Sequence, residues 1–428
     1  MAATKFTYEG SILDPLNTCF HFSTRPYKLQ YQYKLIHKAI KITKLIYIVT
    51  VTFNSSFYLN FALISLVRES PSKDRKMLFN NFGLTFYDKK RATPGFTLFA
   101  PINHNTAYLI NIDGKIVHEW ELQKGGNNLS TLLPNGNLLI TELTDEGPAL
   151  PAGKCGWLRE YSWDGNIVWE HHDENQHHDA RRLPNGNTVY LAWNKLDDKI
   201  AKKIKGGRVG TEYHLDGESI FEDVLREIDS DGKIIWEWHS SALDMDRYTI
   251  CPLCKRHEWA HANTCAPLPN GDIMVSYRVL NLLIIVDRRT SKVKWEYHDQ
   301  DLGHQHDSHI LDNGNVLVFS NGWHGKDINF SRIVEFDPKT KEIIWEYRGK
   351  PALSFFSPHI SGMQRLDSGN TLICEGSKGC IFEVTPSGDI VWEYVSNFWT
   401  KNPLHGNVNW IFRAQRYAAD SPQIQNRA

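Results

Sequence analysis

Hydrophobic and polar positions follow two short patterns that return along most of the chain. One pattern is a β-branched run followed by an aromatic ring and a glutamate, and its copies begin at Ile116, Ile167, Ile234, Val293, Ile343 and Ile390. The other is a polar turn entering an apolar run, in the copies Leu133–Asn137, Leu183–Asn187, Leu268–Asp272, Leu311–Asn315 and Leu366–Asn370. Asn-Gly between alternating apolar residues is a strong signal for a hairpin. The two patterns therefore predict strands joined by tight turns.

A supersecondary unit that recurs every ~45–65 residues, with no amphipathic helix between copies, is typical of a stacked ring of small sheets. The sequence predicts an all-β fold, a six-bladed β-propeller. The unit that starts at Phe96 lacks an innermost strand, and the C-terminal stretch Asn409–Ala414 has no outer strands of its own. We expect that stretch to complete the first blade, which closes the ring and leaves no sheet edge unpaired. The repeated tryptophans are expected to dock one blade on the next.

Four segments are predicted: an extension outside the propeller at 1–76, a linker at 77–95, the propeller at 96–417 and a tail at 418–428. Within the extension, cations precede an uncharged stretch, Leu45–Val67, as in a signal anchor. Polar residues such as Asn54 and Asn60 lower the hydrophobicity of this stretch. Met77 is an alternative first residue of the protein. The protein is expected to be membrane-anchored or exported if this stretch is an anchor, and cytoplasmic otherwise. Two insertions, 195–221 and 240–256, are expected to project from one rim as a lid or as surface loops.

Composition excludes some classes of protein. The 428 residues carry a formal net charge of −1, which gives no field that favours nucleic acid. The seven cysteines do not form a disulfide-scaffold pattern. Cys251 and Cys254 can form half of a zinc knuckle with His257 or Cys265, but a second pair at knuckle spacing is missing. A loop disulfide or free thiols are favoured, and no metal site is predicted.

Histidines recur at one place in the repeat, just before the polar turn: His178, His261, His306 and His359. The strand entering that turn is the innermost strand of a blade, so these imidazoles are expected to point into the central channel. Imidazole can act as nucleophile, base or acid near neutral pH. The guanidinium of Arg278, at the end of the next strand, can neutralise an oxyanion.

These residues carry a family resemblance. The strings Trp259–Thr264, Leu268–Asp272, Ser276–Arg278 and Gly303–Asp307 resemble those of the arylsulfotransferase family, over about residues 95 to 417. The resemblance implies a six-bladed propeller that moves a sulfuryl group from an aryl sulfate to a phenol through a sulfohistidine. It implies no nucleotide donor and no cofactor. The partners it implies are small aryl sulfates and phenols. The chain lacks the separate N-terminal β-domain of well-known members, so acceptor specificity does not carry over.

The resemblance also implies roles. The nucleophile falls on His306, with His304, two residues earlier, as a competitor for that role. His261 and Asn263 would hold the sulfuryl oxygens, and Arg278 would stabilise their charge. His178, in the His177–Asp179 motif, would be the general acid or base on the phenol oxygen. His359 is a channel-facing candidate substrate contact, as are Asn263 and His304.

Other functions remain open from the sequence. A non-catalytic propeller that serves as a binding scaffold fits the same repeats, because a fold does not choose a function. Tryptophan-docked outer strands also resemble those of quinoprotein dehydrogenases, although a quinone site needs carboxylates and a flat aromatic floor. The H-E-x-x-H string His257–His261 requires a helix to bind zinc, and here it enters a strand. No G-x-x-x-x-G-K-[ST] loop for a nucleotide is present.

Overall fold

Antiparallel β-sheet makes up most of the regular structure of the chain. The computed structural model describes residues 21–24, 27–30, 81–150, 152–211, 219–325 and 329–428. The chain divides into two units, 1–80 and 81–428. In the first, strands β1 (His21–Thr24) and β2 (Tyr27–Gln30) form a hairpin. The predicted anchor, Leu45–Val67, lies outside the described residues, and none of the described helices is long and apolar enough to cross a membrane.

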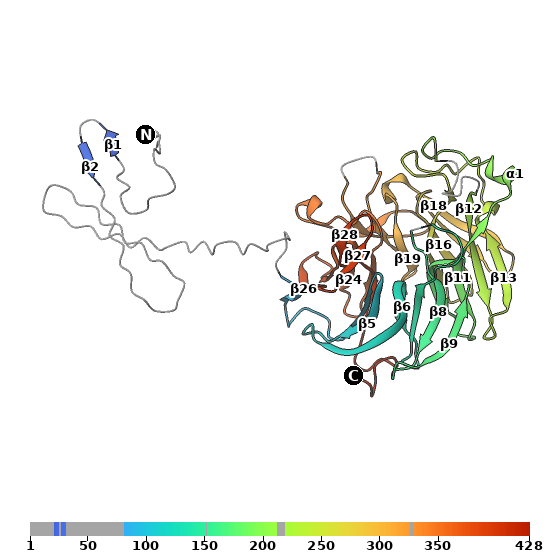
Figure 1. Ribbon diagram of the computed structural model, residues 1–428, viewed down its shortest axis with the longest axis horizontal. Coiled ribbons are helices and arrows are strands. Elements are labelled where there is room, and N and C mark those ends of the chain that lie inside the picture. Colours follow the sequence, from blue (N-terminus) through green and yellow to red (C-terminus); the bar gives the residue numbers. More distant parts are fainter. Residues whose placement is uncertain (1–20, 25–26, 31–80, 151, 212–218, 326–328) are drawn as a thin grey trace. The chain divides into compact units, whose positions relative to one another are not determined.

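The second unit contains four sheets built from consecutive strands (Figure 1). The first comprises β10 (Gln176–Arg182), β11 (Thr188–Lys195), β12 (Phe221–Ile228) and β13 (Ile234–His239), with β14 (Glu258–Trp259) parallel to β12. The second comprises β15 (Ala262–Pro267), β16 (Ile273–Tyr277), β17 (Leu282–Asp287) and β18 (Lys292–His298). The third comprises β19 (His306–Ile310), β20 (Val316–Ser320), β21 (Arg332–Phe336) and β22 (Ile343–Arg348). The fourth comprises β23 (Gly362–Arg365), β24 (Thr371–Glu375), β25 (Cys380–Val384) and β26 (Ile390–Val395), and it also pairs with β3 (Gly83–Tyr87).

A fifth sheet joins both ends of this unit. Its order is β29 (Ile411–Tyr417), β4 (Phe96–Pro101), β5 (His104–Ile110), β6 (Ile116–Leu132), β7 (Leu138–Leu143), β8 (Gly156–Tyr161) and β9 (Ile167–His172). The C-terminal strand therefore pairs with the strand that starts at Phe96. Strand β6 is long because its first half pairs with β5 and its second half with β7. The sheet thus contains two four-stranded groups that share one continuous strand.

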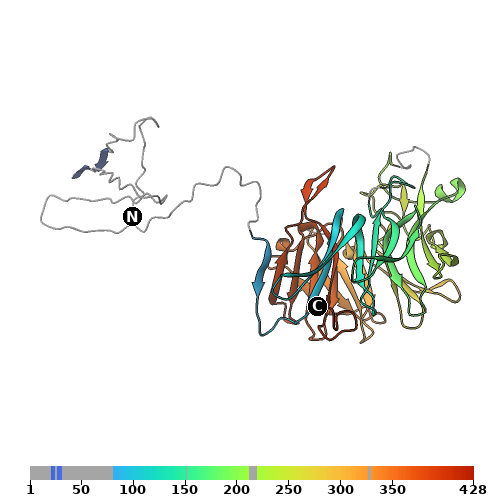
Figure 2. The same ribbon diagram turned by 60° about the horizontal axis from the view of Figure 1, so that its bottom comes forward.

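Short elements complete the unit. A hairpin of β27 (Thr400–Asn402) and β28 (Gly406–Val408) projects from the sheets, in orange-red in Figure 2. Among the described residues the helices are α1 (Asp198–Ala201), η1 (Ser240–Ala242), η2 (Gln300–Leu302), η3 (Ala352–Ser354) and η4 (Gly376–Lys378). The result is an all-β, β-propeller-like fold, as the repeats predict.

Neighbouring sheets pack face to face through apolar side chains that alternate along the strands. In β16, Val275 belongs to a cluster shared with the preceding sheet, whereas Met274 belongs to one shared with the following sheet. Both side chains are fully buried. Successive residues of a strand point to opposite faces, so a strand covered on both faces needs apolar residues at consecutive positions. This requirement accounts for the continuous apolar runs after the polar turns.

The repeated tryptophans link each four-stranded group to the next. Each indole Nε1 donates a hydrogen bond across to the following group, at 2.7–3.1 Å: Trp169 to Ser230 O, Trp236 to Ser291 Oγ, Trp295 to Pro338 O, Trp345 to Pro386 O and Trp392 to Ile112 O. In the first copy, His118 replaces tryptophan, and its Nε2 lies 2.8 Å from Trp163 O. The bond from Trp392 returns to the first group. The tryptophans therefore dock sheets, as their fixed place in the repeat predicts.

Each of these indoles is also covered by a cation, which comes from the first strand in the order of a sheet in three cases and from the turn between the last two strands of a sheet for Arg288 and Lys341. The pairs are Arg182 on Trp169, Arg288 on Trp236, Lys341 on Trp295, Arg365 on Trp345 and Arg416 on Trp392, at 4.2–4.8 Å from the ring centroid. Arg416 is in addition paired with the buried carboxylate of Glu383. A cation over an indole face adds about 0.5–2 kcal/mol, more where water is excluded.

The segments predicted as linker and tail both contact the sheets. Strand β3, within 77–95, lengthens the sheet of β23–β26. In the tail, Ile424 is fully buried and Arg427 donates to Asn135 O at 2.8 Å. The repeats do not extend into either segment, so the sequence patterns could not predict these contacts.

Replacing the indole that links the last group to the first tests its contribution to stability. Trp392→Phe keeps an aromatic ring but removes the donor to Ile112 O, and we expect the free energy of unfolding to fall by about 1–2 kcal/mol. Urea denaturation at equilibrium measures it. The control is Trp399→Phe, which changes a side chain that is 37% exposed, and should stay within about 0.5 kcal/mol. Equal losses in the two variants would show that the bond contributes nothing specific.

Candidate active site

The innermost strands begin with irregular backbone. Register shifts interrupt the pairing of β10, β15 and β19 close to their first residues. His178, His261 and Asp307 have left-handed backbone, with φ of 51°, 55° and 48°. Non-glycine residues rarely adopt this conformation, and where they do the surrounding structure must hold them there. Bulges of this kind redirect side chains, and here they bring residues of the predicted motifs together.

A buried arginine holds these strand ends in place. Arg413 of β29 lies 3.0 Å from Asp179 and 3.1 Å from Asp307, and it donates to Thr264 Oγ1 at 2.8 Å. Asp307 also accepts from the backbone N–H of Met363 at 3.0 Å. One guanidinium therefore joins β10, β15 and β19 to β29, and Asp307 adds β23. All of these groups are buried, so each charge depends on its partners.

His306 is held in a defined orientation by an amide. Its Nδ1 lies 2.8 Å from Asn321 Oδ1, while Asn321 Nδ2 donates to Ser357 O and Ile360 O, at 2.8 and 3.0 Å. Because both amide hydrogens go to carbonyls, the network assigns the oxygen to His306. His306 Nδ1 must then be the protonated nitrogen, which leaves a lone pair on Nε2. Burial and the charge of Arg278 lower the pKa of His306 well below its usual range, against this hydrogen bond.

A second group of imidazoles lies around Glu258. The Glu258 carboxylate accepts from Trp193 Nε1 at 2.9 Å and lies 2.8 Å from His261 Nδ1. His261 faces His178, with ring centroids 4.9 Å apart. His178 Nδ1 in turn lies 2.8 Å from His177 Nδ1, and His177 stacks on Trp193. The string His257–His261 is thus part of a strand and loop, and Glu258 orients a histidine instead of activating water on zinc.

Burial dominates the protonation of this group. It lowers the pKa of His177 to about 3 and that of His178 well below its usual value. Burial would raise the pKa of Glu258, but the neighbouring imidazoles of His261 and His177 bring it down to about 2. Burial, together with the charge of Glu258, raises the pKa of Asp223 well above its usual value. Glu258 is therefore the carboxylate of the cluster, and the histidines His177 and His178 are neutral.

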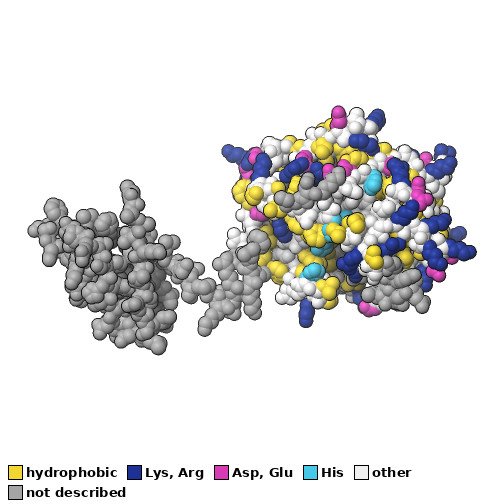
Figure 3. Space-filling view, turned by 90° about the horizontal axis from the view of Figure 1, so that it is seen from above, with side chains coloured by type: hydrophobic (Ala, Val, Ile, Leu, Met, Phe, Trp, Pro, Cys, Tyr) yellow, Lys and Arg dark blue, Asp and Glu magenta, His cyan; other side chains and the backbone are white. Residues whose placement is uncertain are grey.

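Phe412 lies between the two histidine groups. Its ring centroid is 6.1 Å from that of His178 and 6.2 Å from that of His306. On the other side of His178, the loop before β8 packs closely, and a Cβ on Gly153 would lie 2.0 Å from the imidazole. Only glycine fits at this position, where φ is also +77°. Figure 3 shows histidine side chains reaching the surface near the middle of one face of the unit, among hydrophobic side chains.

Arg278 stands at the end of β16, and its N–H donates to His261 O at 2.9 Å. Burial lowers the pKa of the guanidinium, and the nearby thiols and Glu258 raise it. Its charge lowers the pKa of both His306 and His359, the latter to about 4 together with burial. Arg278 therefore supplies positive charge to the space that these imidazoles face.

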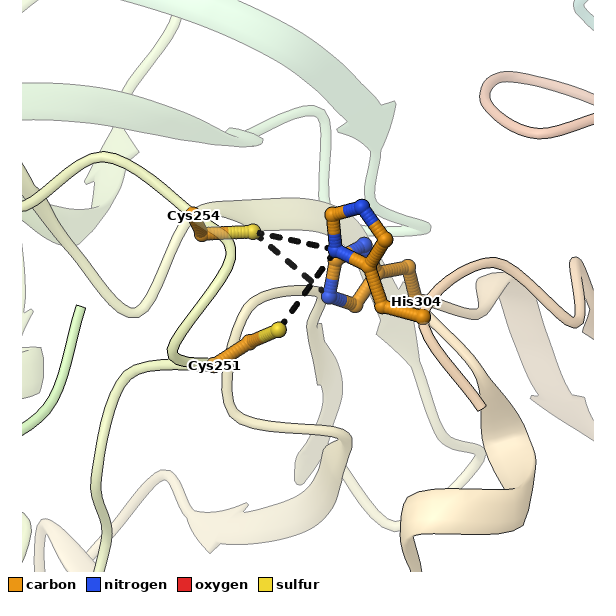
Figure 4. Close-up of side chains that lie close together, drawn as sticks. Cys251, Cys254 and His304 are labelled. Atoms are coloured by element: carbon orange, nitrogen blue, oxygen red, sulfur yellow. Dashed lines mark hydrogen bonds between the residues drawn. The ribbon is translucent and has the colours of Figure 1, made fainter. Parts of the chain in front are cut away.

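The other predicted substrate contacts differ in their surroundings. Asn263 is fully buried, donates to Gln305 O at 2.8 Å and accepts from Thr264 Oγ1 at 3.2 Å. His359 is half-buried and lies against Trp410, with ring centroids 4.6 Å apart. The His304 imidazole faces Cys254, with Nε2 3.6 Å from Sγ (Figure 4), while the carbonyl oxygen of His304 lies 3.1 Å from His306 Nδ1. The imidazoles of His304 and His306 therefore have different partners.

The sequence comparison decides the family. Residues 156–397 match the family model described as Arylsulfotransferase (ASST). The chain belongs to the arylsulfotransferase family. The match covers more than half of the chain, including the strings in which the resemblance was found, and it supports a sulfotransferase role. No curated protein matches the sequence.

Solved structures similar to this chain are distant in sequence. A protein of unknown function from Bacteroides caccae has 15% identity and a TM-score of 0.49, covering 76% of this chain and 99% of its own. Virginiamycin B lyase from Staphylococcus aureus has 14% identity and a TM-score of 0.40, with 74% and 84% covered. Apo AztD from Citrobacter koseri has 14% identity and a TM-score of 0.41, with 76% and 99% covered.

Three residues of the candidate site were not predicted from the sequence. Asn321 lies outside the motifs, 15 residues after the histidine that it holds, and Arg413 lies more than 100 residues after the aspartates that it pairs with. Glu258 was visible only as part of a zinc-protease string. The sequence did contain a signal for the ion pairs of Arg413, because Asp179 and Asp307 each follow a motif histidine directly. Paired acids at equivalent positions of two repeats predict a shared cation, although the pattern does not say which one.

Replacing Arg413 should lower the stability of the fold strongly. In Arg413→Met, Asp179 and Asp307 lose their shared cation while still buried, and we expect the free energy of unfolding to fall by about 3–5 kcal/mol. Chemical denaturation followed by tryptophan fluorescence measures the change. Arg348→Met is the matched control, because its partner Glu346 is only partly buried, and it should cost less than about 1 kcal/mol. A similar loss of stability in both variants would contradict the role of Arg413 as the shared partner of Asp179 and Asp307.

The buried neutral His177 predicts a dependence of stability on pH. Its pKa is about 3 in the folded protein and about 6.5 unfolded, so below pH 6.5 only the unfolded state takes up the proton. Its contribution is complete above pH 6.5 and is lost as the pH falls towards 3. Between pH 7 and pH 5 the loss amounts to about 2 kcal/mol.

Comparing His177→Asn with the parent isolates this contribution. Urea denaturation at pH 7 and pH 5 should show a smaller loss of stability on acidification in the variant, because asparagine does not titrate. The ionisable neighbours of His177, which include His178, Asp223 and Glu258, remain in both proteins. Equal losses would mean that His177 does not titrate as its burial predicts.

Proposed function

We propose that this protein transfers a sulfuryl group from an aryl sulfate to a phenol through a sulfohistidine on His306, without a nucleotide donor. Membership of the arylsulfotransferase family supports the sulfotransferase role. The observation that carries the finer proposal is the contact of His306 Nδ1 with Asn321 Oδ1 at 2.8 Å. It directs the lone pair of the imidazole to Nε2, the atom that would attack sulfur.

In the first half-reaction His306 Nε2 attacks the sulfur of the aryl sulfate. An N–S bond forms, the S–O bond to the ring breaks, and its electron pair leaves with the phenolate. The ring of His306 then carries a positive charge beside the negative sulfuryl oxygens. Asn321 Oδ1 accepts the Nδ1 hydrogen and stabilises that charge, as a carboxylate does for the histidine of a catalytic triad.

In the second half-reaction a phenol collects the group. Its oxygen attacks sulfur as its proton leaves, the S–N bond breaks, and the electron pair returns to Nε2 of His306. We assign this proton to His178, which is neutral and would accept it from the acceptor phenol and pass it to solvent as the product leaves. The phenolate released from the donor in the first half-reaction would take its proton from solvent. The ring of Phe412 lies at similar distances from His178 and His306, and we propose that the phenol ring packs against it.

Charge on the sulfuryl oxygens requires cationic and hydrogen-bonding groups. Arg278 is the proposed cation, because its charge already acts on His306 and His359. His261, oriented by Glu258, is the proposed donor to a sulfuryl oxygen. Asn263 is better suited to positioning, since its amide is bound to Gln305 O and Thr264. His359 is proposed as a contact at the edge of the substrate.

The same proposal includes the architecture. We infer six four-stranded blades, with β6 shared by the first two and the ring closed within the blade that contains β29 and β4. The cyclic series of bonds from His118 and the tryptophans supports this inference, since it passes through six groups and returns to the first. The strands that Arg413 joins, β10, β15, β19 and β29, would then be innermost strands that face one channel.

Covalent labelling of the purified chain tests the proposal. After brief incubation with p-nitrophenyl sulfate and no acceptor, intact-mass spectrometry should detect one added sulfuryl group and peptide mapping should place it on His306. Nitrophenol should appear in an equal amount, with no nucleotide present. His306→Ala should abolish both. Asn321→Leu should form the adduct about 10- to 100-fold more slowly, because the tautomer is no longer fixed.

The control variant is His298→Ala, an exposed histidine at the end of β18, which should label at the parental rate. Circular dichroism establishes that each variant is folded. A folded parent that gains no adduct and releases no nitrophenol would contradict the proposal and leave a non-catalytic scaffold as the better explanation. An adduct retained in His306→Ala would place the nucleophile on another residue.

A further inference from the structure

Four metal-binding side chains meet beside the proposed active site. Cys251 and Cys254 come from the insertion 240–256, His304 precedes β19, and His324 follows β20. One donor atom from each lies within 4.8 Å of all the others. Figure 4 shows both thiols directed at the imidazoles. From the sequence, His257 or Cys265 is the candidate partner of the cysteine pair, whereas the structure places His304 and His324 beside it.

We propose that these four residues bind a zinc ion. Thiolate and imidazole together are the donor set that zinc prefers in proteins, with tetrahedral geometry. Both cysteines are free thiols, so the sulfur atoms are available as ligands. Two thiolates balance the charge of the ion, so the site adds little net charge next to Arg278.

The spacing of the donor atoms fits one ion. A tetrahedron with Zn–S of about 2.3 Å and Zn–N of about 2.05 Å has sulfur–nitrogen edges of about 3.6 Å. The corresponding separations are 3.5 Å from Cys251 Sγ to His324 Nδ1, 3.6 Å from Cys254 Sγ to His304 Nε2, and 3.9 Å from Cys254 Sγ to His324 Nδ1. All three lie within a few tenths of an ångström of the expected edge.

Backbone contacts hold the ligands in place without the ion. On the cysteine side, Cys254 N–H donates to Cys251 O at 2.9 Å, which forms the turn of a C-x-x-C knuckle. On the histidine side, Trp323 N–H donates to Gly303 O at 2.9 Å. A Cβ on Gly303 would lie 2.5 Å from Gly322 Cα, so glycine is needed for this close approach. The two pairs of ligands are thus each preorganised by a separate local structure.

The site would be structural and not catalytic. All four positions around the ion are filled by protein, which leaves none for water or substrate. The ion would fasten the insertion 240–256 to the backbone that leads into β19, two residues before His306. This role is distinct from sulfuryl transfer, and it gives the insertion a fixed position over the site.

Metal analysis of the full-length protein, purified without chelator, tests the proposal. Elemental analysis by mass spectrometry should find about one zinc per chain. Exchange for cobalt should give thiolate-to-metal charge-transfer absorption in the near ultraviolet and the visible bands of a tetrahedral ion. Both readouts are independent of sulfotransferase activity, so failure of one proposal does not imply failure of the other.

Variants identify the ligands. Cys251→Ala with Cys254→Ala, and separately His324→Ala, should lose most of the bound zinc and the cobalt bands. The matched controls Cys380→Ala and His298→Ala change a cysteine and a histidine outside the cluster and should retain one equivalent. Parental protein without zinc, zinc retained in the double cysteine variant, or a disulfide between Cys251 and Cys254 found by peptide mapping would each overturn the proposal.

Discussion

The ion pairs of Arg413 with Asp179 and Asp307 are the interaction on which the site depends. Each inner strand begins with strained or irregular backbone, and such segments keep their shape only when something outside them fixes their ends. A single buried guanidinium performs this task for β10, β15, β19 and β29. The histidines that precede the two aspartates, His178 and His306, are thereby fixed at the ends of β10 and β19.

The site divides its tasks between layers. We assign the chemistry itself to His306, His178 and Arg278. Behind them Asn321 and Glu258 select the nitrogen that each histidine presents, through hydrogen bonds of 2.8 Å. Orientation is therefore supplied by neutral and charged groups alike, and the neutral amide serves the proposed nucleophile, where a carboxylate would add negative charge near an anionic substrate.

The sequence was sufficient for the fold class and for the histidine motifs from which the candidate site is built, because both are repeated. Strand patterns, polar turns and docking tryptophans recur at fixed places, so the antiparallel sheets and the pairing of the C-terminal strand with the strand at Phe96 could be predicted. What occurs once could not. Asn321 lies outside the motifs, Arg413 and the partners of Cys251 and Cys254 depend on contacts between distant segments, and strand β3 lies outside the repeats. The different partners of the His304 and His306 imidazoles are visible only in the three-dimensional structure.

The way the last sheet is linked to the first has a consequence for the order of segments in the chain. The bond from Trp392 to Ile112 is of the same kind as those between consecutive groups, and β29 pairs with β4 inside one sheet. A circular permutant of residues 81–428, with these two residues joined by a linker and a new start in an exposed Asn-Gly turn, would retain every one of these contacts. Strand β6 is the exception, because opening the chain there would cut the strand that two groups share.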